Sequence, residues 1–246
     1  MKLITPVGEY TQLILRSFQR AEKRRVYYEQ IINEMYELGI RSIGFVAFVS
    51  VFVGAVLTIQ TASNIESPFI PRYLIGFATR ESILLEFSPT IISLLLAGKV
   101  GSYIASGIGT MRVTEQIDAL EIMGINSSGY LIFPKIVALV IINPFIVTLS
   151  ILIGIAGGWM ASIFAGVTTS SEFIMGLQTD FELGKYLYAM SKTVIFSFLI
   201  VTIPAYYGYY TTGGALGIGK SSTKAVVNTS IFIIFFNLLL TNIFLS

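Results

Sequence analysis

The chain has 246 residues, of which 54% are hydrophobic and only 12% are charged, and its mean hydropathy is +0.77. A water-soluble domain of this size would lack the polar residues needed to cover its surface, so we predict an all-α integral membrane protein. The net charge of +2 is too small to indicate nucleic-acid binding.

The sequence contains no histidine and no cysteine. These absences remove imidazole acid–base catalysis, thiol nucleophiles and the usual ligands of zinc, haem and iron–sulfur clusters. The aspartates, Asp118 and Asp180, lie in different connections, which excludes an intramembrane aspartate pair. We therefore expect no catalytic residue, no metal site and no cofactor, and we predict that the chain is not an enzyme.

The N-terminal segment, residues 1–39, is too polar for a secretory signal and is predicted to form cytoplasmic or interfacial helices. Within it, residues 10–25 have the spacing of an amphipathic helix. The apolar side consists of Tyr10, Leu13, Ile14 and Phe18, and the basic residues elsewhere are Arg16, Arg20, Lys23 and Arg24. This pattern predicts a helix on the cytoplasmic membrane interface, with packing on a partner protein as the alternative.

The remaining residues, 40–246, are predicted to form one five-span domain, because about 20 apolar residues are needed to cross a bilayer. The predicted spans are residues 40–62, 82–108, 130–166, 184–210 and 225–245. An odd number of spans places the two termini on opposite sides of the membrane.

Lysine and arginine give the orientation. Basic residues flank the first, second and fourth spans on one side: Lys2, Arg16, Arg20, Lys23, Arg24, Arg25, Arg41, Arg112, Lys135, Lys220 and Lys224. The first and third connections, residues 63–70 and 167–183, carry none. The N-terminus, the segment at 109–124 and the loop at 211–224 are therefore predicted to be cytoplasmic, and the C-terminus to face the other side.

Small residues recur every four positions in two spans. The rows are Ala97, Gly101, Ala105 and Gly109 in the second span, beside Gly98, Ser102 and Ser106, and Gly154, Gly158, Ser162 and Gly166 in the third. Such rows allow close approach of helix backbones, so we predict packing helices, with a narrow pore lining as the alternative. Pro89, Pro144 and Pro204 are expected to kink their spans.

Charged residues inside spans are costly unless they are paired or hydrated, which makes them candidates for function. They are Arg80, Glu81, Glu86, Lys99 and Lys192. Arg80 and Lys192 are each predicted to neutralise one glutamate, and Lys99 is expected to extend its ammonium group towards water. For Arg80 and Glu81, structural ion pairing and substrate contact remain open.

Between the second and third spans lies a polar segment, residues 109–124. Thr114 is predicted to cap a short helix that ends at Gly124 in a left-handed conformation. The helix, within residues 113–124, presents an apolar side formed by Val113, Ile117 and Leu120 and an acidic side formed by Glu115, Asp118 and Glu121. A short capped helix between two spans is predicted to dock on another protein.

The segment GALGIGKS at 214–221 matches the phosphate-binding pattern G-x-x-x-x-G-K-S. That motif requires a preceding parallel strand and an acidic magnesium ligand on another strand, whereas both neighbours here are apolar spans. We therefore interpret it as a flexible glycine-rich loop that carries Lys220 at the cytoplasmic interface.

Several of these segments together resemble the MlaE (YrbE) permeases. They are GAVLTIQ at 54–60, Arg80-Glu81 with EFSPT at 86–90, AGKVGS at 97–102, GTMRVTEQIDALEIMG at 109–124, YLIFPK at 130–135, and the glycine-rich segment before Ala225. The resemblance covers nearly the whole chain from about residue 40. Lys99 and Lys135 stand where the family often has arginine, which removes the bidentate fork from any anion clamp there.

The resemblance implies an inner-membrane ABC-transporter permease that forms a homodimer. It also implies a separate cytoplasmic ATPase, bound through the coupling helix, and a periplasmic MCE-domain protein with which phospholipids move between the two membranes. The expected coupling residues are Glu115, Gln116, Asp118, Leu120 and Glu121. The expected lipid contacts are Phe52, Leu57, Arg80, Glu81 and Phe235. A secondary transporter or channel, or a membrane scaffold, without an ATPase partner remains the alternative.

Overall fold

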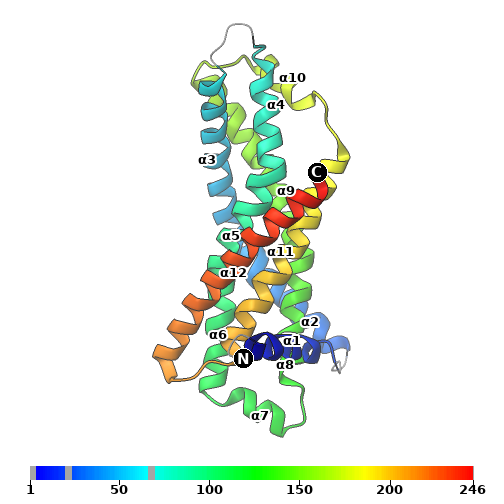
Figure 1. Ribbon diagram of the computed structural model, residues 1–246, viewed down its shortest axis with the longest axis vertical. Helices are drawn as coiled ribbons and strands as arrows, with labels where there is room; N and C mark the ends of the chain where they lie inside the picture. The colour runs from blue at the N-terminus through cyan, green and yellow to red at the C-terminus, as the bar shows by residue number, and fades with distance from the viewer. Residues whose placement is uncertain (1–3, 20–23, 66–69, 246) are drawn as a thin grey trace. The chain divides into compact units, whose positions relative to one another are not determined.

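The computed structural model describes residues 4–19, 24–65 and 70–245, and within these ranges it contains helices and no strand (Figure 1). In chain order the elements, with η for π-helices, are α1 (Ile4–Ser17), α2 (Arg24–Glu34), η1 (Met35–Ile40), α3 (Arg41–Asn64), α4 (Tyr73–Ser82), η2 (Ile83–Ile91), α5 (Ile92–Leu96), η3 (Ala97–Gly101), α6 (Ser102–Val113), α7 (Gln116–Ile122), α8 (Ser127–Leu131), α9 (Phe133–Phe164), α10 (Ser170–Gln178), α11 (Leu183–Tyr209) and α12 (Gly214–Leu245). The all-α prediction is confirmed.

Five helical stretches in the described residues are long and apolar enough to cross a membrane, which confirms the number of spans predicted from the sequence. They are Tyr27–Asn64, Tyr73–Val113, Ser127–Phe164, Leu183–Tyr209 and Gly214–Phe244. The protein is therefore an all-α integral membrane protein with five candidate spans. Its chain divides into two compact units.

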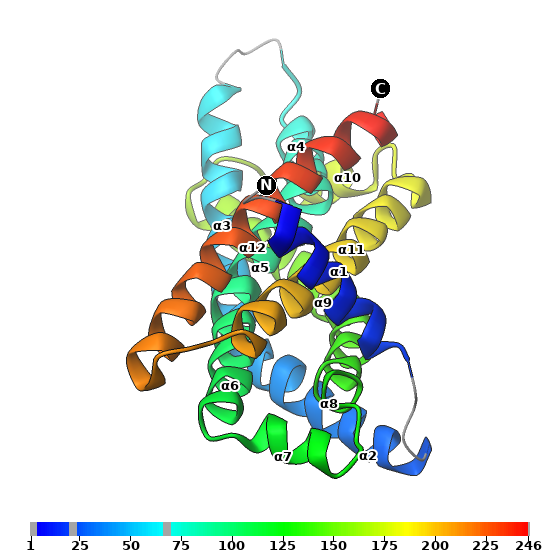
Figure 2. The same cartoon turned by 60° about the horizontal axis from the view of Figure 1, so that its bottom comes forward.

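The first unit comprises Met1–Arg41, Ser93–Asn143 and Val194–Ser246. In it, α6 packs against α12, and α1 lies beside α8 (Figures 1 and 2). The row of small residues on the second span is a packing surface, because a Cβ atom on Gly208 of α11 would lie 2.8 Å from the Ala105 carbonyl oxygen. Such a distance leaves no room for a side chain. The packing interpretation of this row is confirmed.

The second unit comprises Ser42–Ile92 and Pro144–Thr193. Here α3 and α9 are in backbone contact, since a Cβ on Gly54 would lie 1.8 Å from the Gly154 carbonyl oxygen. Beside this contact, Ser50 donates a hydrogen bond to Ser150 (2.8 Å), and Ser150 donates one to Ser88 (3.1 Å). The small-residue row of the third span is thus also a packing surface.

The amphipathic N-terminal helix begins and ends earlier than predicted. Its observed range is Ile4–Ser17, whereas the prediction was 10–25, of which residues 20–23 lie outside the described residues. It ends because the side-chain amide of Asn126 donates hydrogen bonds to the backbone carbonyls of Arg16 (2.8 Å) and Gln19 (2.6 Å). A distant residue therefore stops the helix.

The apolar side of α1 faces its own chain. Leu13 is buried, and the Tyr10 hydroxyl donates a hydrogen bond to Thr202 of α11 (2.7 Å). Burial raises the pKa of Tyr10 above its ordinary value of 10.0, so this hydroxyl remains a donor at neutral pH. Val7 and Leu15 of the same helix are exposed, so α1 also has apolar surface that is available to a membrane interface.

The fifth span begins eleven residues before its predicted start. The glycine-rich segment at 214–221 was expected to be a loop, but it is the first part of α12, which begins at Gly214. The tight turn before it uses Gly213 and Gly214, whose φ angles of 89° and 66° lie in the left-handed region. Packing of α12 on α6 outweighs the low helix propensity of the glycines.

The helix α10 was not predicted. It lies in the third connection and begins with a capping box, in which the Thr169 hydroxyl accepts a hydrogen bond from the Glu172 backbone N–H (3.3 Å). In return, the Glu172 carboxylate accepts one from the Thr169 N–H (2.9 Å). The pattern Thr-x-x-Glu is the sequence signature of this cap and could have located the helix.

Candidate coupling and cargo sites

The short helix between the second and third spans is present as α7, which projects from the end of the first unit (Figures 1 and 2). The predicted stop at Gly124 is confirmed by its φ of 76°. The predicted cap is wrong: α6 continues through Val113, so the Thr114 hydroxyl donates back to the Thr110 carbonyl. Instead, the chain reverses at Glu115, which has a left-handed φ of 59°.

Two of the three acidic side chains of α7 are held by the protein itself. Asp118 pairs with Arg112 at 2.5 Å. Glu121 accepts hydrogen bonds from Ser127 (2.9 Å) and from the Tyr209 hydroxyl at the end of α11 (2.8 Å). These contacts fasten both ends of the short helix. Glu115, by contrast, has an exposed side chain.

The exposed surface of α7 ends in apolar residues. Ile117 is buried and anchors the helix, whereas Ile122 is 88% exposed and Met123 is 65% exposed. Sequence reasoning missed this pair because neither residue belongs to the predicted stripe of Val113, Ile117 and Leu120. Two adjacent exposed apolar side chains at the end of a short helix are suited to contact another protein.

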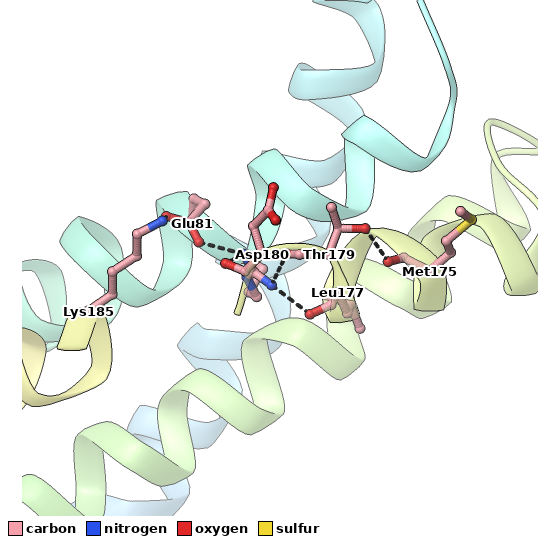
Figure 3. A network of polar contacts seen from close by, with 7 residues as sticks. Glu81, Met175, Leu177, Thr179, Asp180 and Lys185 are labelled. Carbon is pink, nitrogen blue, oxygen red and sulfur yellow. Dashed lines mark hydrogen bonds and ion pairs between the residues drawn. The ribbon is translucent and has the colours of Figure 1, made fainter. Parts of the chain in front are cut away.

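In the second unit, Arg80 of α4 is only 3% exposed. Figure 3 shows several of its partners, Glu81, Leu177, Thr179 and Asp180, close together. Its guanidinium donates to the carbonyls of Leu177 and Thr179, both at 2.7 Å, where α10 ends. It also donates to the Glu81 carboxylate at 2.6 Å and to the Asp180 carbonyl at 3.3 Å. A cation at the carboxyl end of a helix is favourable.

The predicted pairing of intramembrane charges is confirmed. Arg80 pairs with Glu81, which also contacts Lys185 at 3.0 Å (Figure 3). Lys192 is fully buried, and its ammonium group contacts the Glu86 carboxylate at 2.7 Å and the Leu85 carbonyl at 3.2 Å. These ion pairs and hydrogen bonds offset the free-energy cost of placing the charges in a span.

The predicted apolar lipid contacts differ in exposure. Phe52 is 56% exposed and Phe235 is 54% exposed, but Leu57 is buried within the subunit. Phe52 belongs to an exposed apolar face of α3 that also includes Phe45, Phe48, Val56 and Ile59. This α3 face, rather than Leu57, offers surface to an acyl chain.

The described residues contain no group of three or more acidic side chains arranged to hold a metal. The phosphate-binding pattern lies within α12, where backbone amides from Ile218 onward bond inside the helix rather than to a phosphate. The fold and the sites thus define a multi-pass membrane protein.

Comparison with known proteins gives the family. Residues 31–243 match the family model described as Permease MlaE. A probable ABC transporter permease protein of Rickettsia bellii is 34% identical over 99% of this chain and 94% of its own length. A Synechocystis protein with the same description is 34% identical over 90% and 82%, respectively. The chain belongs to the MlaE permease family.

A plant protein is also similar. Protein TRIGALACTOSYLDIACYLGLYCEROL 1, chloroplastic, of Arabidopsis thaliana is 29% identical over 95% of this chain and 65% of its own length. Its name refers to a glycerolipid.

Proposed function

We propose that this permease subunit moves phospholipids between the inner and outer membranes and is powered by a separate cytoplasmic ATPase that docks on α7. The observation that carries the proposal is the construction of α7, a short helix that is fastened at both ends and exposes Ile122 and Met123. Family membership supports the ATPase partner, since the relatives are described as ABC transporter permeases.

In the proposed coupling mechanism, an ATPase subunit contacts Glu115, Gln116, Leu120, Ile122 and Met123. The bond between Glu121 and Tyr209 then joins α7 directly to α11. Because Ser127 at the start of α8 joins the same cluster, a displacement of α7 moves two further helices. Asp118 acts through Arg112 by fixing the end of α6.

The fifth span supports assembly as a homodimer. Only 11% of the most apolar part of α12 is buried within the subunit, against 61% for α11. The exposed residues of α12 include Ile231, Ile234, Phe235 and Leu238. A second copy that covers this surface would give a dimer, and lipid would cover whatever apolar surface remains.

The proposed cargo is a phospholipid, with its acyl chains on the α3 face. Each buried methylene contributes about 0.8 kcal/mol, so apolar contacts dominate retention. The glycerolipid in the name of the Arabidopsis relative agrees with this class of cargo. Both terminal nitrogens of the Arg80 guanidinium donate hydrogen bonds within the protein, so we assign Arg80 to structure. We assign Glu81 with Lys185, which are more exposed, to the headgroup side.

We infer an inner-membrane location with a cytoplasmic N-terminus and a periplasmic C-terminus. Exposed Lys220 and Lys224 on the first turns of α12 support a cytoplasmic start for that helix. A periplasmic MCE-domain protein would receive or supply the lipid on the opposite side. In this scheme α7, which contacts the ATPase, is cytoplasmic.

Ile122→Asp tests the proposal, because it places a charge in the docking surface without touching a buried residue. We expect at least a tenfold loss of the ATPase subunit, identified by mass spectrometry, when the membrane protein is purified. Leu216→Asp is the matched control, since Leu216 is 81% exposed on α12. Parent protein that purifies without any ATPase would favour a channel, a secondary transporter or a scaffold.

A further inference from the structure

A cavity of about 380 Å³ lies in the first unit. Its lining residues are Glu37, Leu38, Arg41, Lys99, Val100 and Tyr103. The floor is apolar, since Leu38 and Val100 are buried, while the walls carry two cations, one carboxylate and an aromatic ring. Its volume lies in the range of small-ligand sites.

The residues that line this cavity belong to two π-helices or follow them within two positions. Glu37 and Leu38 belong to η1, and Arg41 follows it directly. Lys99 and Val100 belong to η3, and Tyr103 follows one turn later. A π-helical turn is less stable than α-helix and occurs often at functional sites. Neither segment contains proline, so proline does not cause the distortion.

The two π-helices are joined by a polar contact that leaves donors available. The Lys99 ammonium donates to the Arg41 carbonyl at 2.6 Å, and the Arg41 guanidinium contacts the Glu37 carboxylate at 2.5 Å. Lysine has three N–H donors and arginine five, so each cation retains donors for a ligand. The arginine side chain is 60% exposed and therefore accessible.

We propose that this cavity binds the headgroup of an amine-bearing phospholipid. The phosphate lies between Arg41 and Lys99, where charge-assisted hydrogen bonds form to both cations. The amine lies against the Glu37 carboxylate and the face of Tyr103, which is 50% exposed. One negative and one positive ligand group thus meet groups of opposite charge. This proposal depends only on the chain lying in a membrane. It does not depend on lipid transport or on an ATPase partner.

Lys135 is not one of the proposed phosphate ligands. Its ammonium group pairs with Glu34, and it lies 6.0 Å from the centre of the Tyr103 ring. Because Lys135 is paired with Glu34, Arg41 and Lys99 are the two proposed phosphate ligands. The apolar floor would exclude water from the glycerol region of a bound lipid. Inorganic phosphate has no glycerol group and would leave this part of the cavity unfilled.

The experiment measures lipid retention on the full-length protein by native mass spectrometry. Phosphatidylethanolamine, phosphatidylglycerol and diacylglycerol with identical acyl chains are compared. We expect phosphatidylethanolamine to be retained at least tenfold more than diacylglycerol, and Arg41→Gln with Lys99→Gln to remove that preference. Lys224→Gln, at an exposed cation on α12, is the control and should preserve it. Glu37→Gln should lower the preference for phosphatidylethanolamine over phosphatidylglycerol.

Two further arms keep the result unambiguous. If the double variant unfolds, Arg41→Gln alone carries the test because its side chain is exposed, and Lys99→Arg should retain binding. Phe52→Gln, on the α3 face, should lower the retention of all three lipids equally and so reports on the proposed cargo surface instead. Equal retention of phosphatidylethanolamine and diacylglycerol by the parent, or displacement of the lipid by millimolar inorganic phosphate, would overturn the proposal.

Discussion

The α7 region and the Arg80 cluster both stand out in the sequence as charged groups near apolar spans, but they are built in opposite ways. Arg80 is buried, and its donors are directed to carbonyls at the end of α10. The charges of α7 remain at the surface, where they hold the helix while Ile122 projects outward. Burial therefore separates a charge that holds a unit together from one that positions a short exposed helix.

The largest expected effect is on the Arg80 cluster. Arg80→Met leaves Glu81 with one cationic partner and leaves the carbonyls of Leu177 and Thr179 without their donor. Breaking a buried ion pair costs about 3–5 kcal/mol, so we expect a clear drop in the thermal unfolding temperature. Arg72→Met is the control, because Arg72 makes an exposed contact of 3.2 Å to the Val167 carbonyl. Similar unfolding temperatures for both variants would refute the structural assignment of Arg80.

The second prediction concerns the link between α7 and α11. Tyr209→Phe removes the hydrogen bond that its hydroxyl donates to Glu121 and the contact between its hydroxyl and that of Ser127, but keeps the ring. We expect the ATPase subunit to remain bound, with the stimulation of ATP hydrolysis by lipid reduced severalfold, because the contact surface is intact and its linkage is weakened. Tyr210→Phe, at the neighbouring position, should behave as the parent. Loss of ATPase binding in Tyr209→Phe would mean that the tyrosine belongs to the docking surface.

Local pattern accounts for the spans and the packing rows, but not for the long-range contacts. Hydropathy located five spans because the bilayer requires about 20 apolar residues for each. The rows through Gly101 and Gly154 were recognisable because spacing by four places small residues on one face. The start of α12 at Gly214 was not recognisable from the sequence, because packing on α6 outweighs the low helix propensity of glycine.

The candidate coupling and cargo sites were less predictable, because they also depend on contacts between residues far apart in the chain. Glu121 is held by Tyr209, which is 88 positions away in the chain, and α1 is stopped by Asn126, 110 positions from Arg16. The π-helices η1 and η3 leave no recognisable signature in the sequence, because neither contains a proline that would mark the distortion. Exposure of Ile122 likewise depends on the turn at Glu115.

A smaller effect is expected for the ion pair at the start of α7. Asp118 and Arg112 have side-chain exposures of 48% and 37%, so water and salt screen their attraction. Asp118→Asn should lower stability by less than about 1 kcal/mol, as is usual for exposed pairs. Denaturant titration at low and high salt measures it, and the difference from the parent should shrink as salt increases. A salt-independent loss would show that Asp118 acts through another contact.

The smallest effect is at the cap of α10, the helix whose opposite end holds Arg80. The pKa of Glu172 is lowered from its ordinary value of 4.5, first by the backbone N–H and then by the hydroxyl of Thr169. A carboxylate with a lowered folded pKa stabilises the native state above about pH 4.5, and this contribution is lost as the pH falls through the folded value. Unfolding temperatures of the parent and Glu172→Gln should therefore differ slightly at pH 7 and converge in acid. A difference that persists below the folded pKa would show that the charge of Glu172 does not stabilise this cap. The cap would then depend on the Thr169 hydroxyl alone, and Thr169→Val would destabilise α10 equally at every pH.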